Sequence, residues 1–187
     1  MTIEEIFSQI AAHMVEGLMM HSQMSDYFGF LGLKGYQECH KYHYFEENCN
    51  YRKISNYYLC HYNKLILEGS AKNPNIIPES WYKYTRQDVN TPTRKSSIQT
   101  GFEKWIKWER DTKKLYEKFY QELMILNEVA SAIELKKYIV DVDYELAEAI
   151  QKELELKAID YDMSLIVDLQ KEKYEEYADK IKEVNLC

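Results

Sequence analysis

The stretch EGLMMHSQMSDYFGFLGLKGYQECHKYHYFEE, residues 16–47, decides the fold. It holds two amphipathic patterns separated by GFLGLKG, residues 29–35, where three glycines supply the conformations that end one helix and begin the next. Apolar residues recur at helical spacing before the break: Ile3, Ile6, Ile10, Met14 and Leu18. These patterns predict one helix from about Thr2 to Leu31 and a second from about Tyr36 to Glu68, packed as a hairpin.

A second hairpin is expected after a long connection. All three prolines of the chain fall in residues 70–97, the only long irregular stretch, which can run the length of a bundle. Helical patterns then predict a third helix over about 93–135, a break near 136–143 and a fourth helix over about 143–184. Two hairpins joined by one long crossover describe an all-α, four-helix bundle. The 187 residues are enough for one such domain, residues 1–187.

Composition excludes several classes of function. The chain carries a formal net charge of −7 and no stripe of Arg and Lys, so we expect no nucleic-acid partner. No stretch approaches the roughly 20 apolar residues of a membrane span, and the start of the chain lacks a secretory pattern. Three of the four cysteines fall on one predicted helix at spacings that match no zinc motif. We therefore expect reduced thiols and a cytoplasmic location.

Four carboxylates carry the candidate chemistry: Glu16, Glu47, Glu109 and Asp162. Each shares a helix face with apolar or aromatic residues three, four or seven positions away, which indicates that it turns inward. A carboxylate that faces a core is costly unless it is paired, protonated or bound to a metal.

The four carboxylates are also expected at one depth. With the first turn near Leu33, Glu16 lies opposite a position one turn from Glu47. A full-length crossover brings Glu109 to the same level, and a second turn near Lys137 places Asp162 one turn from it. Four carboxylates at one level are typical of a metal site in a helical bundle.

At this point the chain resembles the ferritin-like superfamily. The likeness covers nearly the whole length in helix count, connection order and carboxylate placement. The chain is also similar to bacterial ferritin-like proteins of unassigned activity, through residues 16–47 and through YRKISNYYLCHYNKL at residues 51–65.

The resemblance implies a di-iron or di-manganese site with departures from the usual pattern. Di-iron members take one Glu from each of two helices and a Glu-x-x-His pair from each of the others. Glu16 and Glu109 would be the single carboxylates. Glu47 and Asp162 would begin the pairs, but Asn50 and Leu165 stand where the histidines belong. A compensating imidazole could come from His43, one turn before Glu47.

Two hypotheses follow. The first is a ferritin-like metal-binding protein of the oxidase type, with iron or manganese held by Glu16, Glu47, Glu109, Asp162 and His43. The second is a non-catalytic helical interaction protein in which the site is vestigial and no metal binds. As a partner we expect a second copy of the chain, with a dimer favoured.

Overall fold

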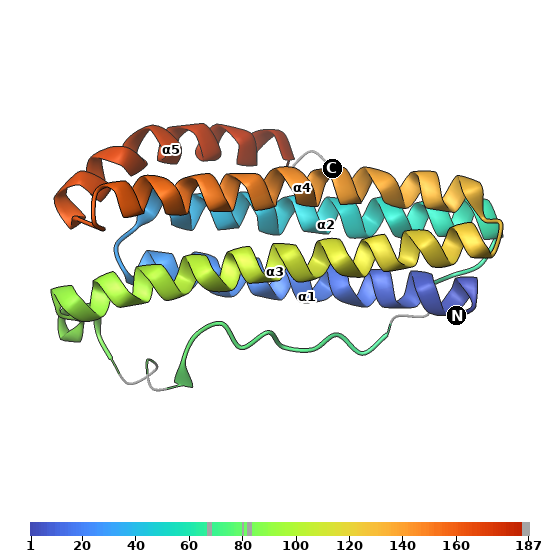
Figure 1. The fold of residues 1–187 in the computed structure, drawn as a ribbon, viewed down its shortest axis with the longest axis horizontal. Coiled ribbons are helices and arrows are strands. Elements are labelled where there is room, and N and C mark those ends of the chain that lie inside the picture. The colour runs from blue at the N-terminus through green and yellow to red at the C-terminus, as the bar shows by residue number, and fades with distance from the viewer. Residues whose placement is uncertain (67–68, 80, 82–83, 185–187) are drawn as a thin grey trace.

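The structure is a computed structural model that describes residues 1–66, 69–79, 81 and 84–184. Its long elements are helices: α1 (Ile3–Phe30), α2 (Lys34–Tyr62), α3 (Thr91–Ile125), α4 (Val129–Ala158) and α5 (Met163–Val184). A short 3-10 helix, η2 (Arg86–Asp88), precedes α3. The expected all-α architecture of two hairpins joined by a crossover is confirmed (Figure 1).

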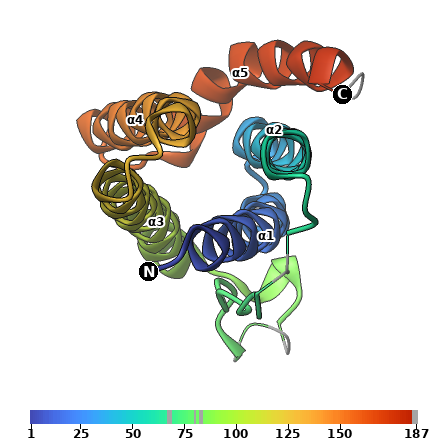
Figure 2. The same ribbon diagram turned by 90° about the vertical axis from the view of Figure 1, so that its right-hand side faces the viewer.

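Four helices surround a common centre and the fifth lies outside them. α1 pairs with α2, α3 pairs with α4, and the two hairpins approach each other along α1 and α3 (Figure 2). α5 packs along α2. Gly35, in the first turn of α2, permits this close approach, because a Cβ there would lie 2.6 Å from the carbonyl oxygen of Gln170. The Gly35 amide instead donates to the Gln170 side chain at 3.0 Å.

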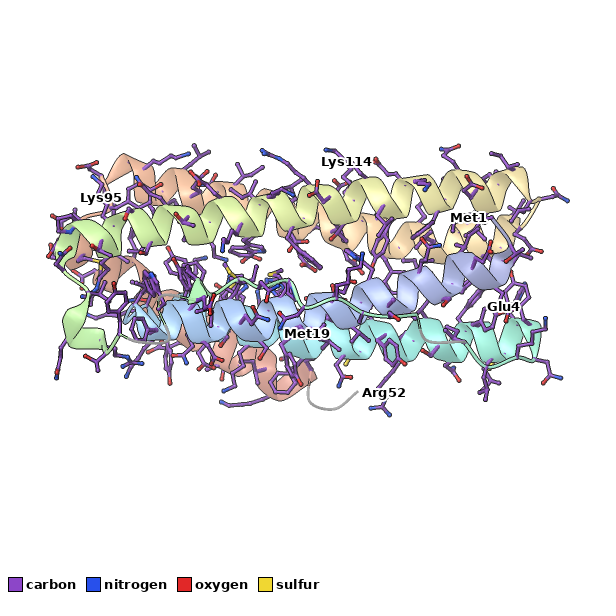
Figure 3. The ribbon with its side chains drawn as sticks, turned by 90° about the horizontal axis from the view of Figure 1, so that it is seen from below. Met1, Glu4, Met19, Arg52, Lys95 and Lys114 are labelled. Carbon is purple, nitrogen blue, oxygen red and sulfur yellow. The ribbon has the colours of Figure 1, made fainter. Side chains whose placement is uncertain are left out.

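The crossover runs lengthwise along α1, as the sequence predicts. The Lys72 amide donates to Glu16 at 2.8 Å, and further along the Ile76 amide donates to Gln23 at 2.7 Å. Figure 3 shows this segment lying along α1 toward the end of the bundle where Lys95, near the start of α3, is labelled. α2 and α3 are therefore parallel, and the crossover returns the chain to the level at which α2 began.

Three helix ends use the same left-handed turn, and this corrects the boundaries expected for the second hairpin. In the first turn Gly32 has φ +82°, and the Leu33 amide donates back to Phe28. Asn127 takes the same role after α3, with φ +60°, and the Glu128 amide donates to Leu123. The helices predicted over 93–135 and 143–184 are therefore wrong in their bounds, because the chain already turns at Asn127.

The third such turn splits the last predicted helix. Asp160 and Tyr161 have φ +50° and +57°, and the Tyr161 amide donates to Leu156. Asp and Asn tolerate this conformation better than most residues. The chain consequently leaves α4 and folds back as α5.

Two hydrophobic clusters fill the bundle, one toward each end. The cluster near the α1–α2 turn is built around Phe28, Phe102 and Trp105. The cluster near the opposite end contains Phe7 and Phe119. Each such buried side chain contributes about 1.5–3 kcal/mol. Between the two clusters lies a layer of buried polar and ionisable side chains, which is the candidate site.

Candidate metal centre

Glu109 of α3 is the most enclosed carboxylate of the polar layer. The residue is 2 % exposed, and its Oε1 accepts a hydrogen bond of 3.0 Å from Trp105 Nε1 one turn earlier. Its Oε1 also lies 3.8 Å from Nε2 of His21 on α1. One indole N–H does not saturate a buried carboxylate, so Glu109 retains lone pairs for a further partner.

Glu145 of α4 joins Glu109 and His21 in a group of three. Each of these residues offers one ligand atom, and the three atoms lie within 4.8 Å of one another. All three residues are buried. Imidazole nitrogen and carboxylate oxygen are the donors that iron, manganese and zinc take in proteins.

His43 of α2 faces the same carboxylates from the other side. Its Nδ1 lies 3.3 Å from Glu46 and 3.7 Å from Glu145, and its Nε2 lies 3.5 Å from Glu148. His43, Glu46 and Glu145 form a second group of possible ligands, which shares Glu145 with the first.

The histidine nitrogens support a ligand role. Within the described residues, Nε2 of His21 and both ring nitrogens of His43 are buried without a hydrogen-bond partner. Buried polar atoms are normally satisfied, and a cation between imidazole and carboxylate would satisfy both. The unpartnered ring nitrogens and the neighbouring carboxylates therefore fit a divalent metal ion.

Glu47 reaches the layer beside α1. Its carboxylate lies against Gly17, where an added Cβ would be 3.2 Å from Glu47 Oε1. The glycine leaves room for this carboxylate at a place where another side chain would crowd it. α1 thus contributes the imidazole of His21 and the space left by Gly17, whereas the carboxylates come from α2, α3 and α4.

The carboxylates repel one another and hold protons. Burial, with the nearby charge of Glu47 acting in the same sense, raises the pKa of Glu109 to about 8 even though His43 and Trp105 oppose the shift. Burial and Glu109 also raise the pKa of Glu145, and burial and Glu145 raise the pKa of Glu47. Buried like charges cannot all ionise without compensating cations.

The imidazoles separate into two kinds. Burial opposes a charged His43, but Glu145 and the other polar groups around the ring raise its pKa well above the usual range. Burial and the charge of His43 lower the pKa of His21. Burial, together with His21, His43 and Lys152, lowers the pKa of His40. His21 is therefore a neutral imidazole at pH 7, the form in which a histidine binds metal.

Lys152 closes the layer on the side of α5. Its ammonium donates to Glu148 and, at 2.6 Å, to the hydroxyl of Tyr177. Tyr177 in turn donates to Glu148. Burial opposes ionisation of Glu148, but the neighbouring His43 ring and the Lys152 ammonium lower its pKa to about 2.

Two of the five expected ligands lie elsewhere. Glu16 faces the crossover, where it accepts from the Lys72 amide and contacts His13 at 3.3 Å. Asp162 is exposed in the turn between α4 and α5, where Oδ1 accepts from the amide of Ser164 at 2.8 Å. Asp162 is not on the fourth helix of the bundle because that helix ends at Ala158.

The other three expected ligands, His43, Glu47 and Glu109, do converge. Sequence reasoning missed His21, Glu145 and Glu148. The level argument finds Glu145 once the turn is placed at Asn127 instead of Lys137.

Comparisons with known proteins agree with this fold. No family model matches the sequence, and no curated protein matches it. Solved structures do match. A humanized archaeal ferritin is 20 % identical over 91 % of this chain and 94 % of its own, with a TM-score of 0.74. A closed form of the Archaeoglobus fulgidus ferritin, engineered by mutagenesis, is 18 % identical over 93 % of this chain and 96 % of its own, with a TM-score of 0.75.

An open-pore ferritin from the same archaeon is 19 % identical over 91 % of this chain and 94 % of its own, with a TM-score of 0.74. The likeness spans nearly the whole of both chains. The fold of this chain is therefore the one seen in these ferritin structures.

Proposed function

We propose that this protein binds a divalent transition metal, iron or manganese, in the polar layer of its bundle. The ligands are Glu109, Glu145 and His21, with His43 and Glu47 completing the surroundings. The observation that carries the proposal is the set of buried imidazole nitrogens without hydrogen-bond partners that face the carboxylates of Glu109 and Glu145. The described residues contain three groups of side chains that could bind a metal ion, and all three lie in this layer.

The chemistry we propose is of the oxidase type. A reduced metal held here would supply electrons to dioxygen or peroxide. The protein would exclude bulk water through its two hydrophobic clusters. Glu109 and Glu145 would bind the ion as carboxylates and would release the protons that they hold in the metal-free protein. The side chains of Glu46 and Glu148 are 32 % and 31 % exposed, so the layer connects to solvent between α2 and α4.

Metal analysis of protein purified without chelator tests the proposal. We expect iron or manganese in stoichiometric amount, and uptake of ferrous ion by metal-free protein under anaerobic conditions. A protein that is purified without metal and does not bind added ferrous, manganous or cobaltous ions would overturn the proposed metal function.

A non-catalytic interaction protein is the second candidate, and one observation favours it. Lys152 and His43 already place positive charge among the carboxylates, so part of the layer is compensated without a metal. Such a bundle would remain folded and keep its partner binding after Glu109 and Glu145 are both replaced by Gln, with no change in metal content.

We further propose that the chain forms a homo-oligomer, with a dimer favoured, in the cytoplasm. Apolar side chains gather around the α3–α4 turn and are at least 39 % exposed: Met124, Ile125, Leu126, Val129 and Ile133. An exposed apolar patch of this kind is typical of an interaction site. Cys39 and Cys60 are free thiols, which suits a reducing compartment, and Cys187 lies outside the described residues. No described helix is long and apolar enough to cross a membrane.

A further inference from the structure

The polar layer contains a third group of possible ligands on the side of α5. Cys39, His43 and Glu148 each offer one atom, and the three atoms lie within 4.8 Å of one another. This group shares His43 with the neighbouring group around Glu145. An ion bound by Glu145 would draw on the first two groups, which share that carboxylate, and a second ion would then have this third group as its ligands.

Lys152 already places a positive charge in this third group. Its Nζ donates to Glu148 and lies 3.7 Å from the sulfur of Cys39, so it contacts two of the three candidate ligands. The residue is 3 % exposed, and the charge is therefore enclosed with them. A metal ion bound by the same atoms would meet this ammonium at contact distance.

The ammonium is held from several sides and cannot easily move aside. Tyr177 of α5 accepts from it at 2.6 Å, and the ring of Trp105 lies 5.7 Å from Nζ. Tyr177 is itself covered by Lys180, whose Nζ is 4.9 Å from the phenol ring. Moving Lys152 would therefore break its contacts with α2, α4 and α5 together.

We propose that Lys152 acts as a fixed internal cation that takes the place of a second metal ion, so that each chain binds one divalent ion rather than two. The inference rests on the proposed metal function and specifies its stoichiometry. The single ion binds through Glu145 and its imidazole and carboxylate neighbours. Glu148 pairs with the lysine, and the lysine prevents Cys39 from binding the metal.

Cobalt titration of metal-free protein tests this. Co²⁺ binding is counted by calorimetry and by metal analysis, and a thiolate ligand is recognised by its sulfur-to-cobalt charge-transfer band in the near ultraviolet. We expect one Co²⁺ per chain in the native protein, with no such band. Lys152→Met keeps the length of the side chain without its charge. It should double the count to two and introduce the band, because Cys39 then becomes a ligand.

Two matched variants separate the charge from the shape. Lys152→Arg keeps the positive charge and should stay at one Co²⁺. Adding Cys39→Ser to Lys152→Met should remove the charge-transfer band. Two ions in the native protein would overturn the inference while leaving the metal function intact, and this holds even if the Lys152 variants fail to fold.

Failure of the two ideas can be told apart. No Co²⁺ in the native protein would overturn the metal function. In that case a single thiolate-bound ion in Lys152→Met would still support exclusion by the lysine. A folded Lys152→Met variant with the native count would overturn the exclusion.

Discussion

Glu109 and Glu145 are mirror images across the α3–α4 turn, because each lies 18 residues from Asn127. In an antiparallel hairpin this spacing puts them at the same depth. Both side chains are buried, and they share His21 as a neighbour. The left-handed turn at Asn127 thereby sets the register on which the candidate centre depends.

Replacing either carboxylate of this pair should remove the metal. We expect Glu109→Gln and Glu145→Gln each to lower metal content at least about tenfold, since removing one of few ligands costs at least about 1.4 kcal/mol of binding. Glu117→Gln is the control, because Glu117 lies on the same helix as Glu109 but is exposed. Metal analysis after dialysis measures the outcome. Equal metal content in all three variants would place the metal elsewhere.

The metal-free protein should lose stability as the pH rises from 6.5 to 8. In the folded state the pKa of Glu109 is raised to about 8, so its proton is retained there but is already lost in the unfolded chain. The folded state therefore binds more protons in this window, and stability falls with pH. The raised pKa values of Glu145, Glu47 and His43 act in the same direction.

The size of this effect is measurable by thermal melts. A single group that behaves in this way costs about 1.4 kcal/mol per pH unit, so Glu109 alone accounts for about 2 kcal/mol over the window. This corresponds to a fall in Tm of about 4–8 °C for a chain of this size. Glu109→Gln should flatten the profile. A Tm that stays constant or rises from pH 6.5 to 8 would contradict the buried-proton account.

Trp105 should report on the centre by fluorescence. Its indole N–H donates to Glu109, so a paramagnetic ion bound to that carboxylate lies close enough to quench the ring. We expect Co²⁺ to quench native emission, and Trp105→Phe to lose most of that quenching. Trp108→Phe should keep it, because Trp108 instead stacks on His13 at 4.8 Å. Quenching that survives in Trp105→Phe and disappears in Trp108→Phe would move the ion toward His13.

The crossover should depend on one side chain of α1. Gln23 donates to Asn73 and accepts from the Ile76 amide, each at 2.7 Å. Gln23→Ala should cost about 1–3 kcal/mol, because two hydrogen bonds are lost. It should also speed tryptic cleavage after Lys72. Gln9→Ala, exposed on the same helix, is the control. Unchanged cleavage in Gln23→Ala would show that other contacts hold the segment.

The oligomer should depend on the apolar patch at the α3–α4 turn. Ile125 and Ile133 are 79 % and 58 % exposed, so a Glu at either position costs the isolated chain little but disrupts an apolar interface. Light scattering should show a smaller assembly for Ile125→Glu with Ile133→Glu. Leu154→Glu, a control on α4 away from the turn, should keep the native mass. A monomeric native protein would reject the oligomer.

The first hairpin and the crossover could be predicted from sequence because glycines mark the turn and prolines mark the connection. The second turn could not, since Asn127 adopts there the left-handed conformation that Gly32 adopts in the first. Placing the turn ten residues too late shifted the expected partner of Glu109 by twenty residues, from Glu145 to Leu165, which brought Asp162 to the wrong level.

The sequence also predicted that Glu16, and not His21, is the residue of the first helix that faces the site. This error has a different cause. The two residues are five positions apart on α1 and point to different faces. An amphipathic pattern with apolar residues on both faces does not decide which one enters the core. The structure decides it through Gly17 and Met24, which share the inner face with His21.

The phenol of Tyr177 connects α5 to the centre, through its hydrogen bond with the Lys152 ammonium. Each residue depends on the other. Without Tyr177 the lysine would lose a hydrogen-bond acceptor, and without Lys152 the phenol would face Glu148 with no neighbouring cation. Natural selection should therefore treat them as a unit. Among related chains that end after α4, an uncharged residue is expected where Lys152 stands. Gain of the lysine and gain of the extra helix are expected on the same branches of the family tree.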